Sequence, residues 1–188
     1  GKTVAPRLRA GAPIPTPSDS DSPALTPRVR AQPAAMPGRI RLLVSACLLG
    51  EHVRYDGQHK YDAFLVEMLG RFVEWERVCP EVDCCLPTPR PSMHLVGDPE
   101  APRLVSRTGL DLTEPMRRFT QARLDELAAI ELCGYVCKKD SPSSGMERVK
   151  VYNDRGMPER SGAGLFTAAF IGRFPLIPVE EEGRLHDA

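Results

Sequence analysis

The sequence has no long apolar run and no excess of charge of either sign. A transmembrane helix needs roughly 18 consecutive apolar residues, and no segment provides them, so no membrane-spanning helix is expected. The 25 basic residues balance the 25 acidic residues, which gives no general electrostatic reason to expect a nucleic acid or an anionic membrane as partner. No apolar segment begins the sequence, so no secretory signal is expected, and the protein is predicted to be cytoplasmic.

The six cysteines do not indicate a disulfide scaffold. Such scaffolds belong to short secreted chains, whereas this chain has 188 residues and no expected signal peptide. Free or metal-binding thiols are therefore expected. Hydrophobic residues make up 41% of the sequence, which is enough apolar material for a folded core.

The first 37 residues differ in composition from the rest. They hold 8 of the 19 prolines, and their five basic and two acidic residues give them a charge of +3, against −3 for the remainder. This composition predicts a disordered Pro/Ala-rich arm over 1–37, followed by one domain over 38–188. Met36 is a candidate start of the chain.

Short apolar strands alternate with amphipathic helices from residue 39 onward. Strands or extended segments are predicted at 41–46, 74–78, 94–96, 103–105, 135–137, 149–152 and 175–179, with helices at 61–72, from Thr113 to about 130, and at 163–173. Thr113 is expected to cap the long helix. Alternating strands and helices predict an α/β layered domain with a mostly parallel sheet flanked by helices.

Polar loops follow three of the predicted strands, after Ala46, after Val78 and after Lys139. Ligands of open parallel sheets bind beyond the carboxyl ends of the strands. We therefore expect the three loops to meet at one edge of the sheet and to form the functional site there.

Two of these loops contain cysteines with the spacing of a metal site. Cys47 follows the first strand, and Cys79 and Cys84 form a C-x4-C pair after the second. Three thiolates suit an iron–sulfur cluster or zinc, and three protein ligands leave one position open to a substrate. A buried core thiol at Cys47 with incidental loop cysteines is the alternative, and Cys85 could take the place of Cys84.

Other residues of these loops are candidates for acid–base chemistry and binding. Glu81 could act as a general acid or base beside a dry metal centre, or be a solvated carboxylate. The serine-rich turn 141–145 could hold a heteroaromatic substrate or an anion, or be an ordinary turn; it lacks the phosphate-binding G-x4-G-K pattern. Arg90 could neutralise a cluster, hold a substrate oxygen or form a structural ion pair. Cys133 and Cys137 are expected in the core.

The same loops resemble a known bacterial family. The motifs, in order, are Val44-Ser45-Ala46-Cys47-Leu48-Leu49-Gly50, Arg54-Tyr55-Asp56-Gly57, His59-Lys60, Cys79-Pro80-Glu81-Val82, Leu86-Pro87-Thr88-Pro89-Arg90 and Ser141-Pro142-Ser143-Ser144-Gly145-Met146-Glu147-Arg148-Val149. They are similar to the family catalogued as domain of unknown function number five-twenty-three, whose characterised members are thiouracil desulfurases. The end of the chain resembles the YbgA-like branch, whose longer members carry a further helical domain.

The resemblance implies an enzyme with a [4Fe-4S] cluster held by three cysteines. Its open iron would take sulfur from a thiolated base such as thiouracil, so that C=S is replaced by C=O without net redox change and hydrosulfide is released. The site expected from spacing and resemblance together assigns metal ligation to Cys47, Cys79 and Cys84, catalysis to Glu81 and Ser141, and substrate binding to Ser143, Ser144 and Arg90.

One motif departs from the family pattern. Many relatives have a cysteine, and so a third ligand, where this chain has Ser144. Cys84 is the expected replacement, with Cys85 and Cys137 as the other thiols to consider. The alternative function is a non-catalytic module that binds a nucleobase and holds structural zinc.

Overall fold

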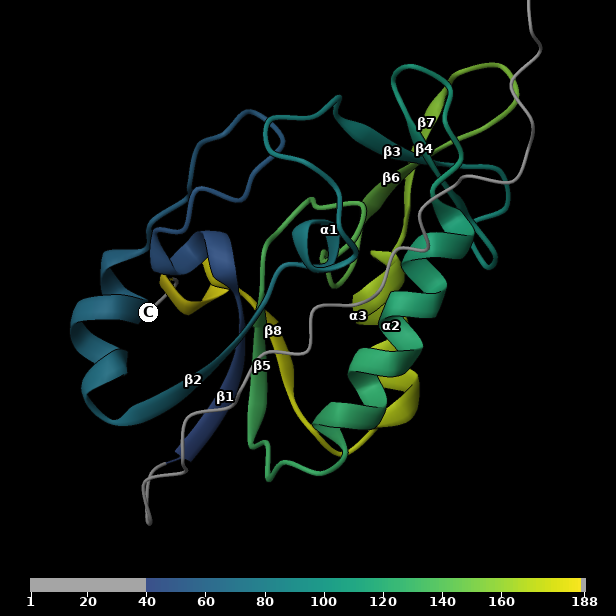
Figure 1. Ribbon diagram of the computed structural model, residues 1–188. Helices are drawn as coiled ribbons and strands as arrows, with labels where there is room; N and C mark the ends of the chain where they lie inside the picture. Colours follow the sequence, from purple (N-terminus) through teal and green to yellow (C-terminus); the bar gives the residue numbers. More distant parts are fainter. Residues whose placement is uncertain (1–39, 187–188) are drawn as a thin grey trace, which may run out of the picture.

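The computed structural model describes residues 40–186, which are built around a four-stranded parallel sheet (Figure 1). The order is β2–β1–β5–β8, and each neighbouring pair is parallel. The strands are β1 (Ile40–Ser45), β2 (Val73–Val78), β5 (Gly134–Cys137) and β8 (Val179–Glu181). This sheet confirms the predicted α/β class. The predicted arm over 1–37 lies outside the described residues.

Both faces of this sheet are covered, which explains the continuous apolar character of β1. Successive strand residues point to opposite faces. Leu43 therefore packs into the larger core with α2 (Thr113–Leu127) and α3 (Leu165–Arg173), both on one side of the sheet in Figure 1, and Val44 into a smaller core on the other side. Within residues 40–186, no helix combines the length and apolar character needed to span a bilayer.

Aromatic rings fill the larger core between β5 and the two helices. The fully buried Phe166 ring lies edge-on to Tyr135, with ring centres 6.0 Å apart, and stacks on Phe119 at 6.4 Å. Phe170 packs against Tyr135 at 5.2 Å. These contacts fix α3 against the strand that leads into the serine-rich turn.

The smaller core is covered by irregular turns, so the predicted helix over 61–72 is wrong. A π-helical turn at Phe64–Met68 and a 3-10 turn at Leu69–Arg71 replace it. Only Leu65 of these residues is buried, while Met68 is exposed, and Gly70 disfavours a regular helix. Further 3-10 turns lie at Ala46–Leu49 and Glu182–His186.

A second four-stranded sheet lies beside the first, which the sequence did not predict as a separate sheet. Its order is β4–β3–β6–β7, with β3–β4 and β6–β7 antiparallel and β3–β6 parallel. The strands are β3 (Met93–Val96), β4 (Arg103–Ser106), β6 (Val149–Tyr152) and β7 (Pro158–Gly162). β7 was not predicted because its sequence is polar and begins with proline.

The start of α2 differs in detail from the prediction. Thr113 is the first helical residue and Leu112 precedes it as the cap, so Thr113 is not the cap. Its hydroxyl instead accepts a hydrogen bond from the Leu104 backbone N–H at 2.9 Å, and the Asp111 carboxylate accepts one from the Thr113 backbone N–H at 2.9 Å. A short helix, α1 (Pro80–Asp83), also lies in the stretch predicted to consist of turns.

Candidate active site

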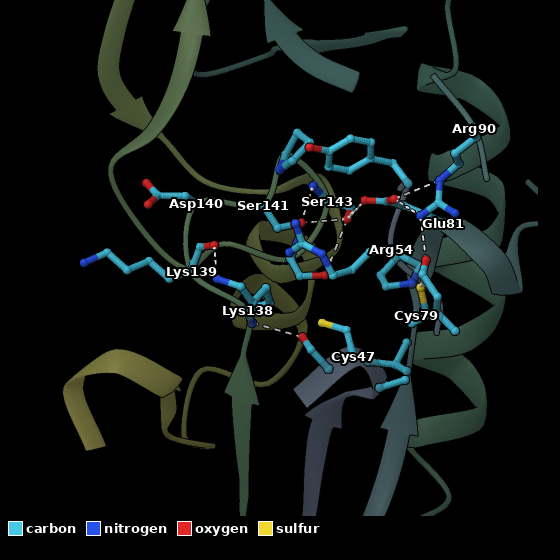
Figure 2. A pocket seen from close by; sticks show the side chains of 18 residues that line it. Cys47, Arg54, Cys79, Glu81, Arg90, Lys138, Lys139, Asp140, Ser141 and Ser143 are labelled. Atoms are coloured by element: carbon cyan, nitrogen blue, oxygen red, sulfur yellow. Dashed lines mark hydrogen bonds and ion pairs between the residues drawn. The ribbon is translucent and has the colours of Figure 1, made fainter. Parts of the chain in front are cut away.

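The loops that leave β1, β2 and β5 line a cavity of about 300 Å³ at the carboxyl edge of the parallel sheet (Figure 2). Its lining includes Cys47 from the first loop, Cys79, Glu81 and Arg90 from the second, and Ser141, Ser143 and Ser144 from the third. The structure therefore brings together the three loops that the strand-end argument expects at one edge. Of the expected site residues, the cavity lining lacks Cys84.

Cys47 lies in the 3-10 turn directly after β1, and a glycine makes the turn possible. Gly50 has a φ of 91°, a left-handed conformation that glycine adopts without steric cost, and its N–H closes the turn onto the Cys47 carbonyl at 3.3 Å. Burial raises the pKa of the Cys47 thiol to about 11, although the nearby Lys138 and Arg54 oppose the shift. Without a bound cation the thiol is therefore protonated at neutral pH.

Cys79 directly follows β2 and precedes α1. Its backbone N–H donates to the Asp83 carboxylate at 2.9 Å, and Pro80 occupies the first helical position, where a missing N–H costs nothing. Burial, reinforced by the neighbouring Glu81 carboxylate, raises the pKa of the Cys79 thiol to about 12. Binding of a metal by Cys47 and Cys79 would thus release their protons, which makes binding pH-dependent.

The Arg90 guanidinium makes all of its hydrogen bonds to other groups of the protein. Its Nε and Nη2 donate to one carboxylate oxygen of Glu81, Nη2 also donates to the Val53 carbonyl, and Nη1 donates to the Pro87 carbonyl and the Thr88 hydroxyl. These contacts use all five guanidinium N–H donors. The structure therefore shows Arg90 in the ion pair with Glu81, with each guanidinium N–H used within the protein.

Two serine hydroxyls connect the other Glu81 oxygen to the cavity surface. Ser143 donates to Glu81 Oε1 at 2.8 Å and lies 3.0 Å from the Ser141 hydroxyl. Because Ser143 has one hydroxyl proton and gives it to Glu81, Ser141 must donate to Ser143. The Ser141 oxygen also accepts from the backbone N–H groups of Ser143 and Ser144, at 3.3 and 3.1 Å. Figure 2 shows this chain of contacts.

The beginning of α3 holds the serine-rich turn in place. The backbone N–H groups of Leu165 and Phe166 donate to the carbonyls of Pro142 and Ser143, at 3.2 and 2.9 Å. The Thr167 hydroxyl donates to the Ser144 carbonyl at 2.7 Å. These bonds fix where the serine side chains enter the cavity before any ligand binds.

Cys84 lies outside the cavity although it is five residues from Cys79. It follows the last residue of α1, its side chain is buried in the larger core, and its Sγ lies 3.3 Å from the Glu81 carbonyl oxygen. The chain thus places Cys79 in the cavity lining and Cys84 in the core, which the spacing alone could not show. Cys137 is fully buried as expected, whereas Cys133 is exposed, which corrects its expected core position.

Comparison with known proteins identifies the family. The sequence model of the 2-thiouracil desulfurase family matches residues 42–182. The chain belongs to this family. The resemblance of its loop motifs is thereby confirmed, whereas a comparison with curated proteins gives no match.

A solved member of the 2-thiouracil desulfurase family has the same fold as this chain. It is a [4Fe-4S]-dependent thiouracil desulfidase, TudS, with 35% sequence identity and a TM-score of 0.63. The match covers 79% of this chain and 95% of that one. The described domain therefore corresponds to nearly the whole of the solved relative.

Proposed function

We propose that this protein is a [4Fe-4S]-dependent desulfidase that converts the C=S group of a thiolated pyrimidine, such as thiouracil, to C=O and releases hydrosulfide. The observation that carries the proposal is the shared cavity: two thiols, a carboxylate and a serine pair lie together at the carboxyl edge of the sheet. The family and the solved [4Fe-4S]-dependent relative support this chemistry.

The donor atoms of the cavity fit an iron–sulfur cluster at two positions. Cys47 and Cys79 supply soft sulfur ligands, as such clusters require. Residues 40–186 contain no group of three or more His, Cys, Asp or Glu side chains arranged to hold a metal ion. A closed structural zinc site needs about four such ligands, so the zinc-binding module is the less favoured function.

The cavity also supplies a path for a proton. A bound cluster with an open iron would act as Lewis acid and sulfur acceptor. Ser141 faces the cavity, and its proton can pass to Ser143 while Ser143 passes its own to Glu81. The Ser141 oxygen, steadied by two backbone N–H donors, then takes a proton from the attacking water. One proton has thus moved from water to Glu81, as general base catalysis requires.

Arg90 and Lys138 position this machinery rather than react. Arg90 fixes one Glu81 oxygen, so the other stays aligned with Ser143. Lys138 forms an ion pair with Glu182 at 2.6 Å and lies near enough to Cys47 to favour its thiolate. Lys138 and Arg54 thus offset part of the effect of the nearby Glu182 and Glu81 carboxylates on Cys47.

Anaerobic reconstitution with iron and sulfide tests the proposal. The wild type and C133A should both take up iron and sulfide and release hydrosulfide from thiouracil, because the exposed Cys133 lies outside the cavity. C47A should lose both the cofactor and the activity, and E81Q should lose activity while keeping the cofactor. A C47A protein with normal iron content and normal turnover would contradict the proposal.

A further inference from the structure

The cavity lacks a third thiol, and the four remaining cysteines cannot supply it from where they lie. Cys84 and Cys137 are buried in the larger core. Cys133 is exposed at the amino end of β5, whereas the cavity lies beyond the carboxyl end of that strand. Cys85 follows α1 in a left-handed conformation, with a φ of 72°, and is absent from the cavity lining. Any third protein ligand must therefore be an oxygen.

Most side-chain oxygen atoms that could bind a metal in the cavity already take part in hydrogen bonds or ion pairs. Both Glu81 oxygens are bonded, one to Arg90 and one to Ser143. The Ser141 oxygen takes part in three hydrogen bonds. Asp140 pairs with Arg160 at 3.0 Å near the solvent-exposed surface. These side chains would have to give up existing partners before binding a metal.

Ser45 accepts a hydrogen bond from the Lys138 backbone N–H at 3.0 Å, and Tyr55 is 43% exposed. Ser144 is therefore the exception among the buried hydroxyls of the cavity. The residue is 4% exposed and lines the cavity, and its hydroxyl makes a long contact of 3.5 Å with the Ser143 hydroxyl. Its backbone is fixed by the Thr167 hydroxyl and by the close packing of Gly164, where a Cβ would lie 2.5 Å from the Ser144 nitrogen. A weakly bonded hydroxyl is thus held rigidly in the cavity.

A second buried hydroxyl points to the same role. The Tyr135 hydroxyl interacts with the hydroxyls of Ser45, Ser144 and Thr167, yet within residues 40–186 it has no partner in hydrogen-bonding geometry. A buried donor without an acceptor calls for an explanation, and Ser144 is the least hydrogen-bonded of the three hydroxyls around it.

We propose that Ser144 is the third protein ligand of the cluster, beside Cys47 and Cys79. When the site is loaded, the Ser144 O–H bond breaks, an Fe–O bond forms, and the proton is released to solvent. This inference rests on the proposed function and assigns Ser144 to metal ligation in place of substrate binding. Because oxygen is a harder ligand than sulfur, the site should hold iron less firmly than a site with three thiolates.

The test compares cofactor retention in reconstituted wild type, S144C, S144A and C84A. Iron and sulfide content, the visible spectrum and the rate of iron loss to a chelator are measured, with thermal unfolding of each protein as the check on folding. S144C should lose iron more slowly than the wild type. S144A should lose it at least about tenfold faster, because even loss of an outer-sphere partner costs that much affinity. C84A should match the wild type.

The outcomes separate this inference from the proposed function. If neither the wild type nor S144C takes up iron and sulfide, the desulfidase proposal fails. If the wild type holds the cluster and S144A holds it equally well, or if C84A loses it, only the assignment of Ser144 is overturned. Uptake by S144C but not by the wild type would also overturn it, because Ser144 would then not act as a ligand.

Discussion

Replacement of Arg90 by methionine should destabilise the protein more than any loss of a surface charge. The Arg90 side chain is 3% exposed and its partner Glu81 is 14% exposed. The substitution leaves Glu81 without its guanidinium and removes the donors to the Val53 and Pro87 carbonyls. Breaking a buried pair by removing one partner costs about 3–5 kcal/mol. Equilibrium urea unfolding should therefore give R90M a lower free energy of unfolding by that amount.

A double-mutant cycle separates the ion pair from the loss of packing. In the R90M background, E81Q should cost little or even restore stability, because the uncompensated charge is gone. The two substitutions should thus be non-additive by roughly 1–3 kcal/mol. The matched control is R117M, which breaks the exposed pair of Arg117 and Glu114 and should cost about 1 kcal/mol or less. Strict additivity, or an R90M cost no larger than that of R117M, would refute the argument.

Three further substitutions probe the surroundings of the site and the fold. G164A should lower both the melting temperature and the iron content, because the added Cβ would lie 2.5 Å from the Ser144 nitrogen. F166A should reduce the free energy of urea unfolding by about 3–5 kcal/mol, since its ring is fully buried. Hydrogen bonds from Thr113 lower the pKa of Asp111, so its contribution to stability is present above its ordinary pKa and is lost as the pH falls. The difference in melting temperature between wild type and D111N should therefore shrink below about pH 4.

The sequence predicted the part of the fold that creates the site. The run Leu42–Ser45 is apolar enough to be a central strand, and a parallel sheet places its end beside the ends of β2 and β5. That argument, together with the loop motifs, predicted that Cys47, Cys79 and the serine-rich turn lie together, and they line one cavity. The second sheet could not be predicted in the same way, because β3 pairs with β6 across a long separation that no local pattern records.

Two of the expected site residues, Cys84 and Arg90, have surroundings that the sequence did not reveal. Spacing along a loop does not determine the direction of a side chain once a helical turn intervenes, and α1 directs Cys84 into the core. Residue type also does not reveal which hydrogen bonds a side chain already makes within the protein. Arg90 has the chemistry to bind a substrate oxygen, but five protein contacts use its donors. The partners of a polar group are set by the fold and not by its residue type.

The cavity separates two tasks between two sets of residues. Arg90, Glu81, Ser143 and Ser141 form a chain whose hydrogen bonds are complete without a cofactor, so loss of the cofactor should leave their arrangement intact. The thiols and the Ser144 hydroxyl make few hydrogen bonds of their own, so they are the groups left to bind a cofactor. Variants of the first set should therefore change turnover at constant iron content. Variants of the second set should change iron content first, and turnover only in proportion to it.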